Sequence, residues 1–366
     1  MKKFYFFSFL MLFGAGSLFA QADFNTGAME VIVNGYGRIR LFTPDDVRHL
    51  QRASILVGTG ETAVFDYTND AEEHEPTVLV EPPLWGDFEI YGSYDNTYSN
   101  LPPNVIVKLN AYGWTNKAFT VLKFNVTNTD AAAVDAIIGL DIIPEIQGEY
   151  GFDTTTYNST TNVTRFHRGA GVTMGMKLLS AGLTSLQSFE WFDDYTADAY
   201  YWGKMTAGAL MPQYISTTFD GPVTVTAQAP ITLAPGQSVD VYYAFSLGAD
   251  EAAMMTALAE AEQKYFDLFT SLTDLNADKN ALRLGNNVPN PFAGTTKISF
   301  HLPTDGLVSL KVYNQMGSEV ATLVNRDMLK GNHSIDFNAT GLAKGVYFYT
   351  LNANGQLLSN RMVITE

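Results

Sequence analysis

The sequence predicts a mainly β protein: a large antiparallel β-sandwich that ends in one amphipathic helix, followed by a second, small β-sandwich. Short apolar runs separated by Gly, Pro, Asn and Asp recur along the chain, a pattern typical of antiparallel sandwiches. The alternation of strand, helix and strand that builds parallel α/β enzymes does not appear. A polar stretch at 273–284 precedes a change of composition, so we expect a large domain at 23–272, a linker, and a small domain at 285–366.

Residues 1–22 have the features of a secretory signal peptide. Lys2 and Lys3 precede an apolar run at 4–13, and small residues lead to a cleavage point after Ala20 or Ala22. The run is shorter than the roughly 20 apolar residues that span a bilayer. We therefore predict export through the periplasm and a mature protein without a transmembrane segment.

Strands are expected throughout the large domain, at 31–41, 78–80, 105–107, 119–128, 137–140, 223–226 and 239–243. In the segment 119–128, one set of alternate residues is apolar and the other becomes polar along its length. The sequence Ala-Pro-Gly-Gln at 234–237 predicts a type II turn, because Pro235 presets φ and Gly236 accepts a positive φ.

One helix is expected at about 250–272. Asp250 can cap its first turn, and Glu251 lies favourably near the positive end of the helix dipole. Apolar residues recur at helical spacing: Met254, Met255, Leu258, Ala261, Tyr265, Leu268, Phe269 and Leu272. We interpret this stripe as a face packed against the sandwich; a partner-binding face is the alternative.

The composition limits the classes of site. The chain has no cysteine, which excludes disulfides, a thiolate nucleophile, a thiolate zinc site and a cysteine-linked lipid anchor. Hydrophobic residues make up 46% of the chain, enough for a sizeable core in each domain.

Acidic charge is concentrated before the small domain. From Gly285 onward the chain has six basic and five acidic residues, a net charge of +1, whereas the whole chain has a net charge of −16. Residues 1–284 therefore carry −17, and −19 once Lys2 and Lys3 are removed. Such a domain repels nucleic acid and anionic lipid. It suits a solvated extracellular protein, or one that binds divalent cations or neutral glycans; acidity for solubility alone is the simpler interpretation.

The small domain reads as a sandwich of roughly seven strands, an immunoglobulin-like module. Alternating apolar residues mark its strands, and a turn at 314–317 has Gly317 where a positive φ is needed. Asn354 and Gly355 are expected to close the last hairpin.

Several residues in this domain also form a recognisable order. Asn287, Pro289, Asn290, Pro291 and Phe292 open it, Gly317 lies in the turn, and Gly345 and Tyr347 belong to the run Gly-Val-Tyr-Phe-Tyr near its end. In this order the segment resembles the type A C-terminal sorting domain of type IX secretion in Bacteroidetes-like bacteria. The resemblance implies recognition by the outer-membrane secretion machinery, proteolytic removal of the domain, and attachment of the cargo to a surface polysaccharide. It predicts a secreted protein or one on the outer cell surface.

Catalytic motifs are largely missing from the sequence. It has no His-Glu-x-x-His, no Gly-x-Ser-x-Gly and no phosphate-binding glycine loop. The large domain's histidines, His49, His74 and His167, are scattered. Whether the protein is an enzyme stays open at this point, with the balance against catalysis.

An aromatic and acidic cluster at 189–202 is a candidate glycan site. Aromatic faces stack on the C–H groups of a sugar while carboxylates accept hydrogen bonds from its hydroxyls. The candidate residues are Trp191, Asp193, Asp194, Tyr195, Asp198, Tyr201 and Trp202. The simpler interpretation is that alternate rings form sandwich core and the acids lie on a loop.

A second acidic cluster is a weaker candidate for calcium, the one cofactor that the sequence suggests. Its oxygen ligands would be Asp141, Glu145, Glu149 and Asp153. Their spacing does not match an EF-hand loop, and a solvated acidic loop explains them more simply.

Two functions follow from these patterns. The first is a non-enzymatic binding or interaction module, with a glycan as its ligand. The alternative is a carbohydrate-active hydrolase or lyase, which needs two carboxylates about 5 to 10 Å apart in a cleft. An open face of rings and acids would favour the first, and a deep pocket the second.

Overall fold

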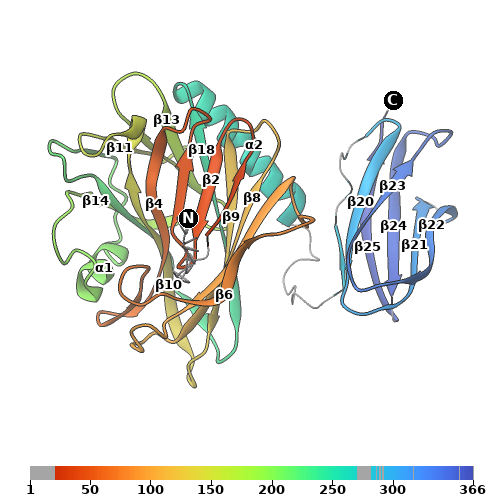
Figure 1. Ribbon diagram of the computed structural model, residues 1–366, viewed down its shortest axis with the longest axis horizontal. Helices are drawn as coiled ribbons and strands as arrows, with labels where there is room; N and C mark the ends of the chain where they lie inside the picture. Colours follow the sequence, from red (N-terminus) through yellow and green to blue (C-terminus); the bar gives the residue numbers. More distant parts are fainter. Residues whose placement is uncertain are drawn as a thin grey trace, which may run out of the picture.

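The computed structural model describes residues 21–269, 282–285, 287, 290, 292–315, 317–353 and 355–365. They form a large β-sandwich and a small one (Figure 1). Most of the expected signal peptide and linker falls outside the described residues. None of the helices within them is long and apolar enough to cross a membrane.

Two nine-stranded antiparallel sheets build the large sandwich. The first sheet has the order β1 (Gln21–Asn25), β2 (Glu30–Asn34), β3 (Ile39–Phe42), β4 (Arg48–Gly60), β10 (Val134–Pro144), β16 (Val223–Gln228), β14 (Leu183–Phe189), with β5 (Ala63–Phe65) beside β4 and β17 (Ile231–Leu233) beside β10. The second sheet has the order β15 (Gln213–Ile215), β11 (Thr154–Asn158), β12 (Val163–His167), β13 (Thr173–Leu178), β18 (Ser238–Gly248), β9 (Phe119–Asn128), β8 (Val105–Gly113), β7 (Phe88–Asp95), β6 (Glu72–Leu79). The predicted antiparallel sandwich is confirmed.

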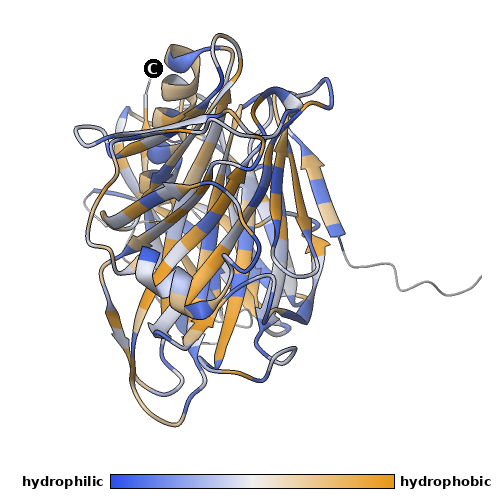
Figure 2. Cartoon of the chain, turned by 90° about the vertical axis from the view of Figure 1, so that its left-hand side faces the viewer, coloured by the Kyte–Doolittle hydropathy of each residue, from blue (hydrophilic) through white to orange (hydrophobic). Residues whose placement is uncertain are grey.

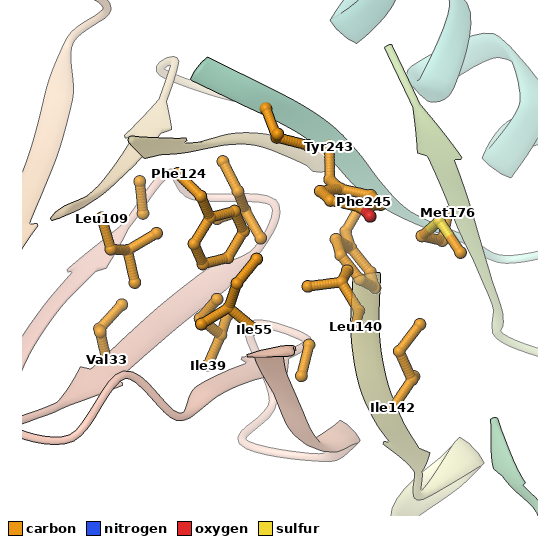
Figure 3. Close-up of a cluster of buried hydrophobic side chains, with 14 of the residues drawn as sticks. Val33, Ile39, Ile55, Leu109, Phe124, Leu140, Ile142, Met176, Tyr243 and Phe245 are labelled. Atoms are coloured by element: carbon orange, nitrogen blue, oxygen red, sulfur yellow. The ribbon is translucent and has the colours of Figure 1, made fainter. Parts of the chain in front are cut away.

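The main core lies between the two sheets. Successive side chains of a strand point to opposite faces, so alternate apolar residues of each strand meet in the middle. Apolar and polar bands accordingly alternate along many strands (Figure 2). Figure 3 shows side chains of the first sheet, such as Ile55 and Leu140, facing Phe124 and Phe245 of the second.

Helix α2 (Glu251–Phe269) covers the outer face of the second sheet. The Ala253 N–H donates to Asp250 Oδ1 at 2.8 Å, which is the expected cap. Met254, Leu258 and Ala261 are buried in a cluster with residues of β9 and β18. The stripe is therefore a packing face over its described length; Leu272 lies outside the described residues.

Helix α1 (Asp198–Met205) covers part of the outer face of the first sheet and was not predicted from the sequence. It buries Tyr201 and Met205 against Leu56 and Val225. The helix has only eight residues, it is rich in aromatic side chains, and Ala197 at its N-cap provides no side-chain hydrogen bond. These features leave little local signal, since tertiary packing stabilises the helix.

Strand β6 is an exposed edge of the second sheet with an unusual sequence. It carries Glu72, Glu73 and Glu75, followed by Pro76, which has no N–H to donate. Its pairing with β7 shifts register twice, between Glu73 and Glu75 and between Glu75 and Val78.

The small sandwich has seven strands in the described residues. One sheet joins β19 (Arg283–Leu284), β20 (Thr295–Leu302) and β23 (Gly331–Asn338). The other joins β22 (Glu319–Met328), β21 (Gly306–Asn314), β24 (Gly345–Ala353) and β25 (Gln356–Ile364). Its core includes Leu282 and Leu284, so its packing begins just before Gly285. The immunoglobulin-like label stays a prediction.

The opening residues of this sandwich are tied to its last strand. Asn290 Nδ2 donates to the Arg361 carbonyl at 3.2 Å, and the Val363 N–H donates to Asn290 Oδ1 at 2.9 Å. Phe292 is buried beside them, while Pro289 and Pro291 lie outside the described residues. Gly317 has φ +77° in the expected turn, and Tyr347 Oη donates to the Ala343 carbonyl at 2.8 Å.

Candidate functional site

The segment after β14 presents two aromatic rings to solvent. Trp191 is 44% exposed and Phe192 is 41% exposed. The next residues, Asp193 and Asp194, are exposed acids, and Asp194 has φ +66°. Rings and carboxylates therefore lie together on an open face.

Directly beneath the exposed rings is a buried polar network. Arg52 of β4 forms an ion pair with Asp141 of β10, and its guanidinium also donates to the hydroxyl of Tyr195. The hydroxyl of Tyr201 donates to Asp141 Oδ2 at 2.9 Å. Burial, together with the Asp141 charge, raises the pKa of Tyr195 and of Tyr201. Both tyrosines therefore remain neutral donors over the physiological pH range.

The exposed segment is anchored through Glu190. Its carboxylate accepts hydrogen bonds from the hydroxyls of Tyr214 (3.0 Å), Ser216 (3.0 Å) and Thr218 (2.8 Å). The next residue, Trp191, donates its backbone N–H to the Asp220 carbonyl. The segment is thus fixed to the neighbouring loop at 216–222.

The seven candidate glycan residues separate into two groups. Trp191, Asp193 and Asp194 are exposed, whereas Tyr195 and Tyr201 are buried parts of the polar network. The other two are half-buried: Asp198 accepts from the Val64 N–H at 3.4 Å, and Trp202 packs over Gly58.

Three exposed rings near this surface were missing from the candidate residues. Phe192 belongs to the same segment, while Phe152 (43% exposed) and Phe219 (75% exposed) come from two other loops. Sequence offers no signal for the last two, because their proximity depends on strand order. A solitary Phe in a loop otherwise looks like a packing residue.

The four calcium candidates do not share one site. Asp141 pairs with Arg52, Glu145 with Arg48 (2.6 Å) and Asp153 with Arg168 (2.9 Å). Burial raises the pKa of Asp153 to about 6, although Arg168 opposes the shift. Glu149 is exposed. Within the described parts of the chain, no group of three or more His, Asp or Glu side chains is arranged to hold a metal ion.

Two of the scattered histidines have structural partners. His49 is buried, and burial lowers its pKa to about 4; its Nδ1 accepts from the Gln147 N–H at 3.0 Å. His74 lies on β6, with Nδ1 2.8 Å from Asp95 Oδ2.

The surface also has a cavity of about 410 Å³. It is lined by the hairpin of β11 and β12 and by the first turns of α2, including Tyr157, Arg165, Glu251 and Met254. Arg165 and Glu251 form an ion pair there. None of the candidate glycan residues lines this cavity.

Residues 288–365 match the family model of the secretion system C-terminal sorting domain. This match confirms the resemblance to type IX sorting domains and shows that the protein is exported to the extracellular space or the cell surface. The sorting domain also implies interaction with the type IX secretion machinery. No curated protein matches the chain.

The chain is similar in fold to several solved structures. A bacterial glucoamylase complexed with acarbose matches with TM-score 0.50 and 10% identity over 65% of this chain. The match spans only 33% of the glucoamylase. A polysaccharide lyase (TM-score 0.35, 9% identity, 95% of this chain and 46% of the lyase) and a galactose mutarotase-like protein from Lactobacillus casei (TM-score 0.36, 9% identity, 62% and 100%) are more distantly similar. At sequence identities this low, the comparison shows similarity of fold alone.

Proposed function

We propose that the exported cargo is a non-enzymatic binding module that holds a glycan on the rings of Trp191 and Phe192. The faces of these rings stack on the C–H groups of a pyranose. The carboxylates of Asp193 and Asp194 accept hydrogen bonds from its hydroxyl groups, and bonds to a charged acceptor are the stronger kind.

The observation that carries this proposal is that Trp191 is exposed and yet held in place. Its backbone is hydrogen bonded to Asp220, and its ring packs edge-on against Tyr195, with the centroids 6.3 Å apart. Tyr195 is itself fixed by the buried Arg52. A ring that is already ordered loses little conformational entropy when a ligand stacks on it, which favours binding.

The geometry favours binding over hydrolysis. Asp141 is buried with Arg52, and Glu190 is occupied by hydroxyl donors, so neither carboxylate is free to transfer protons to a substrate. Asp193 and Asp194 lie on an open face, where water is not excluded. The glucoamylase of similar fold acts on carbohydrate, which fits a glycan ligand for this chain without assigning it a reaction.

Affinity electrophoresis of the purified cargo in gels containing neutral polysaccharides tests the proposal. Retention should fall at least about tenfold, equivalent to about 1.4 kcal/mol, in Trp191→Ala. The melting temperature should stay close to that of the wild type because the ring is not core. Tyr98→Ala is the matched control, since this ring is 68% exposed in another loop.

Unchanged retention of Trp191→Ala, or no retention of the wild type, would overturn the proposed function. Release of reducing ends from a retained polysaccharide would instead favour the hydrolase alternative.

A further inference from the structure

We infer that the site takes an extended, neutral polysaccharide chain rather than a single sugar or the end of a glycan. This inference rests on the proposed function and adds Phe219 and Phe152 to the binding surface. The four exposed rings, Trp191, Phe192, Phe219 and Phe152, are called the ring strip below.

The ring strip is formed by three segments that lie side by side. The loop at 216–222 is in the middle: the Thr218 carbonyl accepts from the Phe152 N–H at 2.9 Å, and the Asp220 carbonyl accepts from the Trp191 N–H. Phe219 therefore projects from a backbone that is bonded to Phe152 on one side and to Trp191 on the other. Four ring faces are thus held on segments that are bonded to one another, and we treat them as one surface on which more than one sugar unit can stack.

The two added rings contact each other but remain open to solvent. The centroids of Phe152 and Phe219 are 4.8 Å apart in an edge-to-face arrangement. Even so, Phe219 is 75% exposed and Phe152 is 43% exposed. Exposed aromatic rings that gather in one place mark an interaction site more often than isolated ones do.

The backbone is strained where it presents Phe152. This residue has φ +55°, a conformation that a bulky side chain rarely adopts and that costs free energy. Several contacts hold it: its N–H is also 3.3 Å from Ser216 Oγ, and the next residue, Asp153, is paired with Arg168. Strained backbone that is held by surrounding contacts occurs preferentially at functional sites.

Close packing also fixes the relation of the two loops. Gly151 has φ +70°, and a Cβ at this position would collide with the backbone of Thr218 and Phe219. The small residue allows the two loop backbones to approach closely.

The exposed acids around the ring strip disfavour an anionic chain, although one cation, Lys204, lies over the Phe189 and Tyr200 rings that pack against Phe192. Asp193, Asp194 and Asp220 are exposed beside the rings, where their carboxylates are available to accept hydrogen bonds from the hydroxyl groups of a sugar. The cargo as a whole is strongly acidic, so a polysaccharide that carries carboxylates or sulfates is repelled. Hydroxyl-rich neutral glycans meet no such penalty.

Chain length is the test. Cello-, manno-, xylo- and malto-oligosaccharides, each as disaccharide and hexasaccharide, are titrated by calorimetry into wild type, Trp191→Ala, Phe219→Ala and Tyr98→Ala. In the wild type the retained series should bind at least about tenfold more tightly as hexasaccharide than as disaccharide. Phe219→Ala should lose that gain and keep the disaccharide affinity, while Trp191→Ala should weaken both. Tyr98→Ala should match the wild type.

Equal affinity for both lengths together with an unchanged Phe219→Ala variant would overturn the extended site and leave the proposed function standing. If Trp191→Ala changes neither affinity, the proposed function fails and the inference with it. Phosphatidylcholine vesicles are the probe for another occupant: vesicle binding that is lost in Phe219→Ala would assign the ring strip to a lipid surface and contradict the inference. Because Phe219 is 75% exposed, its alanine variant should fold, and a melting curve of the variant is the check.

Discussion

The ring of Tyr195 lies edge-on against the ring of Trp191, with an interplanar angle of 67°, while its hydroxyl contacts Arg52 on the outer face of the first sheet. One side chain therefore links an exposed aromatic surface to a buried ion pair. The surface that we propose for glycan binding is supported from below by charge and hydrogen bonding as well as by apolar packing.

Breaking the buried Arg52–Asp141 ion pair should lower the free energy of unfolding more than breaking an exposed ion pair does. Arg52→Met leaves Asp141 buried without its partner, and loss of one member of a buried pair typically costs about 3 to 5 kcal/mol. Urea unfolding measures the loss. Lys117→Met is the control, because the Lys117–Glu260 pair is exposed and should contribute about 1 kcal/mol or less. Equal costs for the two variants would contradict the role assigned to the network.

A side chain at position 139 should destabilise the large sandwich. Gly139 lies on β10, and a Cβ there would collide with the Thr226 carbonyl and lie 2.7 Å from its carbon. Because that atom belongs to the backbone of β16, Gly139→Ala has to displace a central strand, at a cost of about 1 to 3 kcal/mol. Gly182→Ala is the control, since nothing lies within 4 Å of its Cβ position. Thermal unfolding compares them, and equal melting temperatures would refute the steric argument.

Stability should depend on pH through Asp66. Burial raises the pKa of this carboxyl from 3.8 to about 7, although hydrogen bonds from Asn69 oppose the shift. The folded protein then holds a proton that the unfolded chain releases above pH 4. The associated stabilisation is complete below about pH 4 and is lost as the pH rises through about 7, by up to about 1.4 kcal/mol per pH unit.

Asp66→Asn carries no titrating group and should remove this dependence. The stability of the wild type relative to Asp66→Asn should therefore fall between pH 4 and 7, measured by urea unfolding at several pH values. Gly182→Ala, which changes no charge, should keep the slope of the wild type. Parallel pH profiles for wild type and Asp66→Asn would exclude a raised pKa at this position.

Removal of residues 270–366 should leave a folded cargo that is not exported. Among the residues that the structure describes, the core of the large sandwich includes none from the small one, and the strands of the large sandwich are complete by Gly248. Cell fractionation of a host with type IX secretion should find the truncated chain in the periplasm, with its melting transition retained. Full-length Trp191→Ala should be released as the wild type is. Release of the truncated chain would show that another signal directs export.

Local patterns predicted the two sandwiches well, because sandwiches depend on strand periodicity and turn residues, whereas the sorting domain was identified from its resemblance to a known family. The segment Phe119–Asn128 illustrates why. Leu122, Phe124 and Val126 enter the core between the sheets, while Phe119 and Val121 face outward beneath α2. Past the helix the outward positions become polar. The change from apolar to polar outward residues, which is visible in the sequence, therefore marks the point beyond which α2 no longer covers the strand.

The candidate site was only partly predictable. Composition marked the segment around Trp191, but it could not separate the exposed Trp191 from the buried Tyr195 four residues later. Nor could it connect Phe152, Trp191 and Phe219, since their proximity arises from strands that are far apart in the sequence. The acids considered for calcium show the same limit: their arginine partners, such as Arg52 for Asp141, come from a different strand.

Strand β6 has a consequence for how the protein behaves at high concentration. An open strand with free N–H and C=O groups invites a second chain to extend the sheet, which leads to filaments. Three glutamates, a proline without an N–H and two breaks in register all oppose such an addition at this edge. Addition of a second copy of the chain at β6 is therefore disfavoured, and a partner that binds this edge has to recognise its side chains rather than donate a strand.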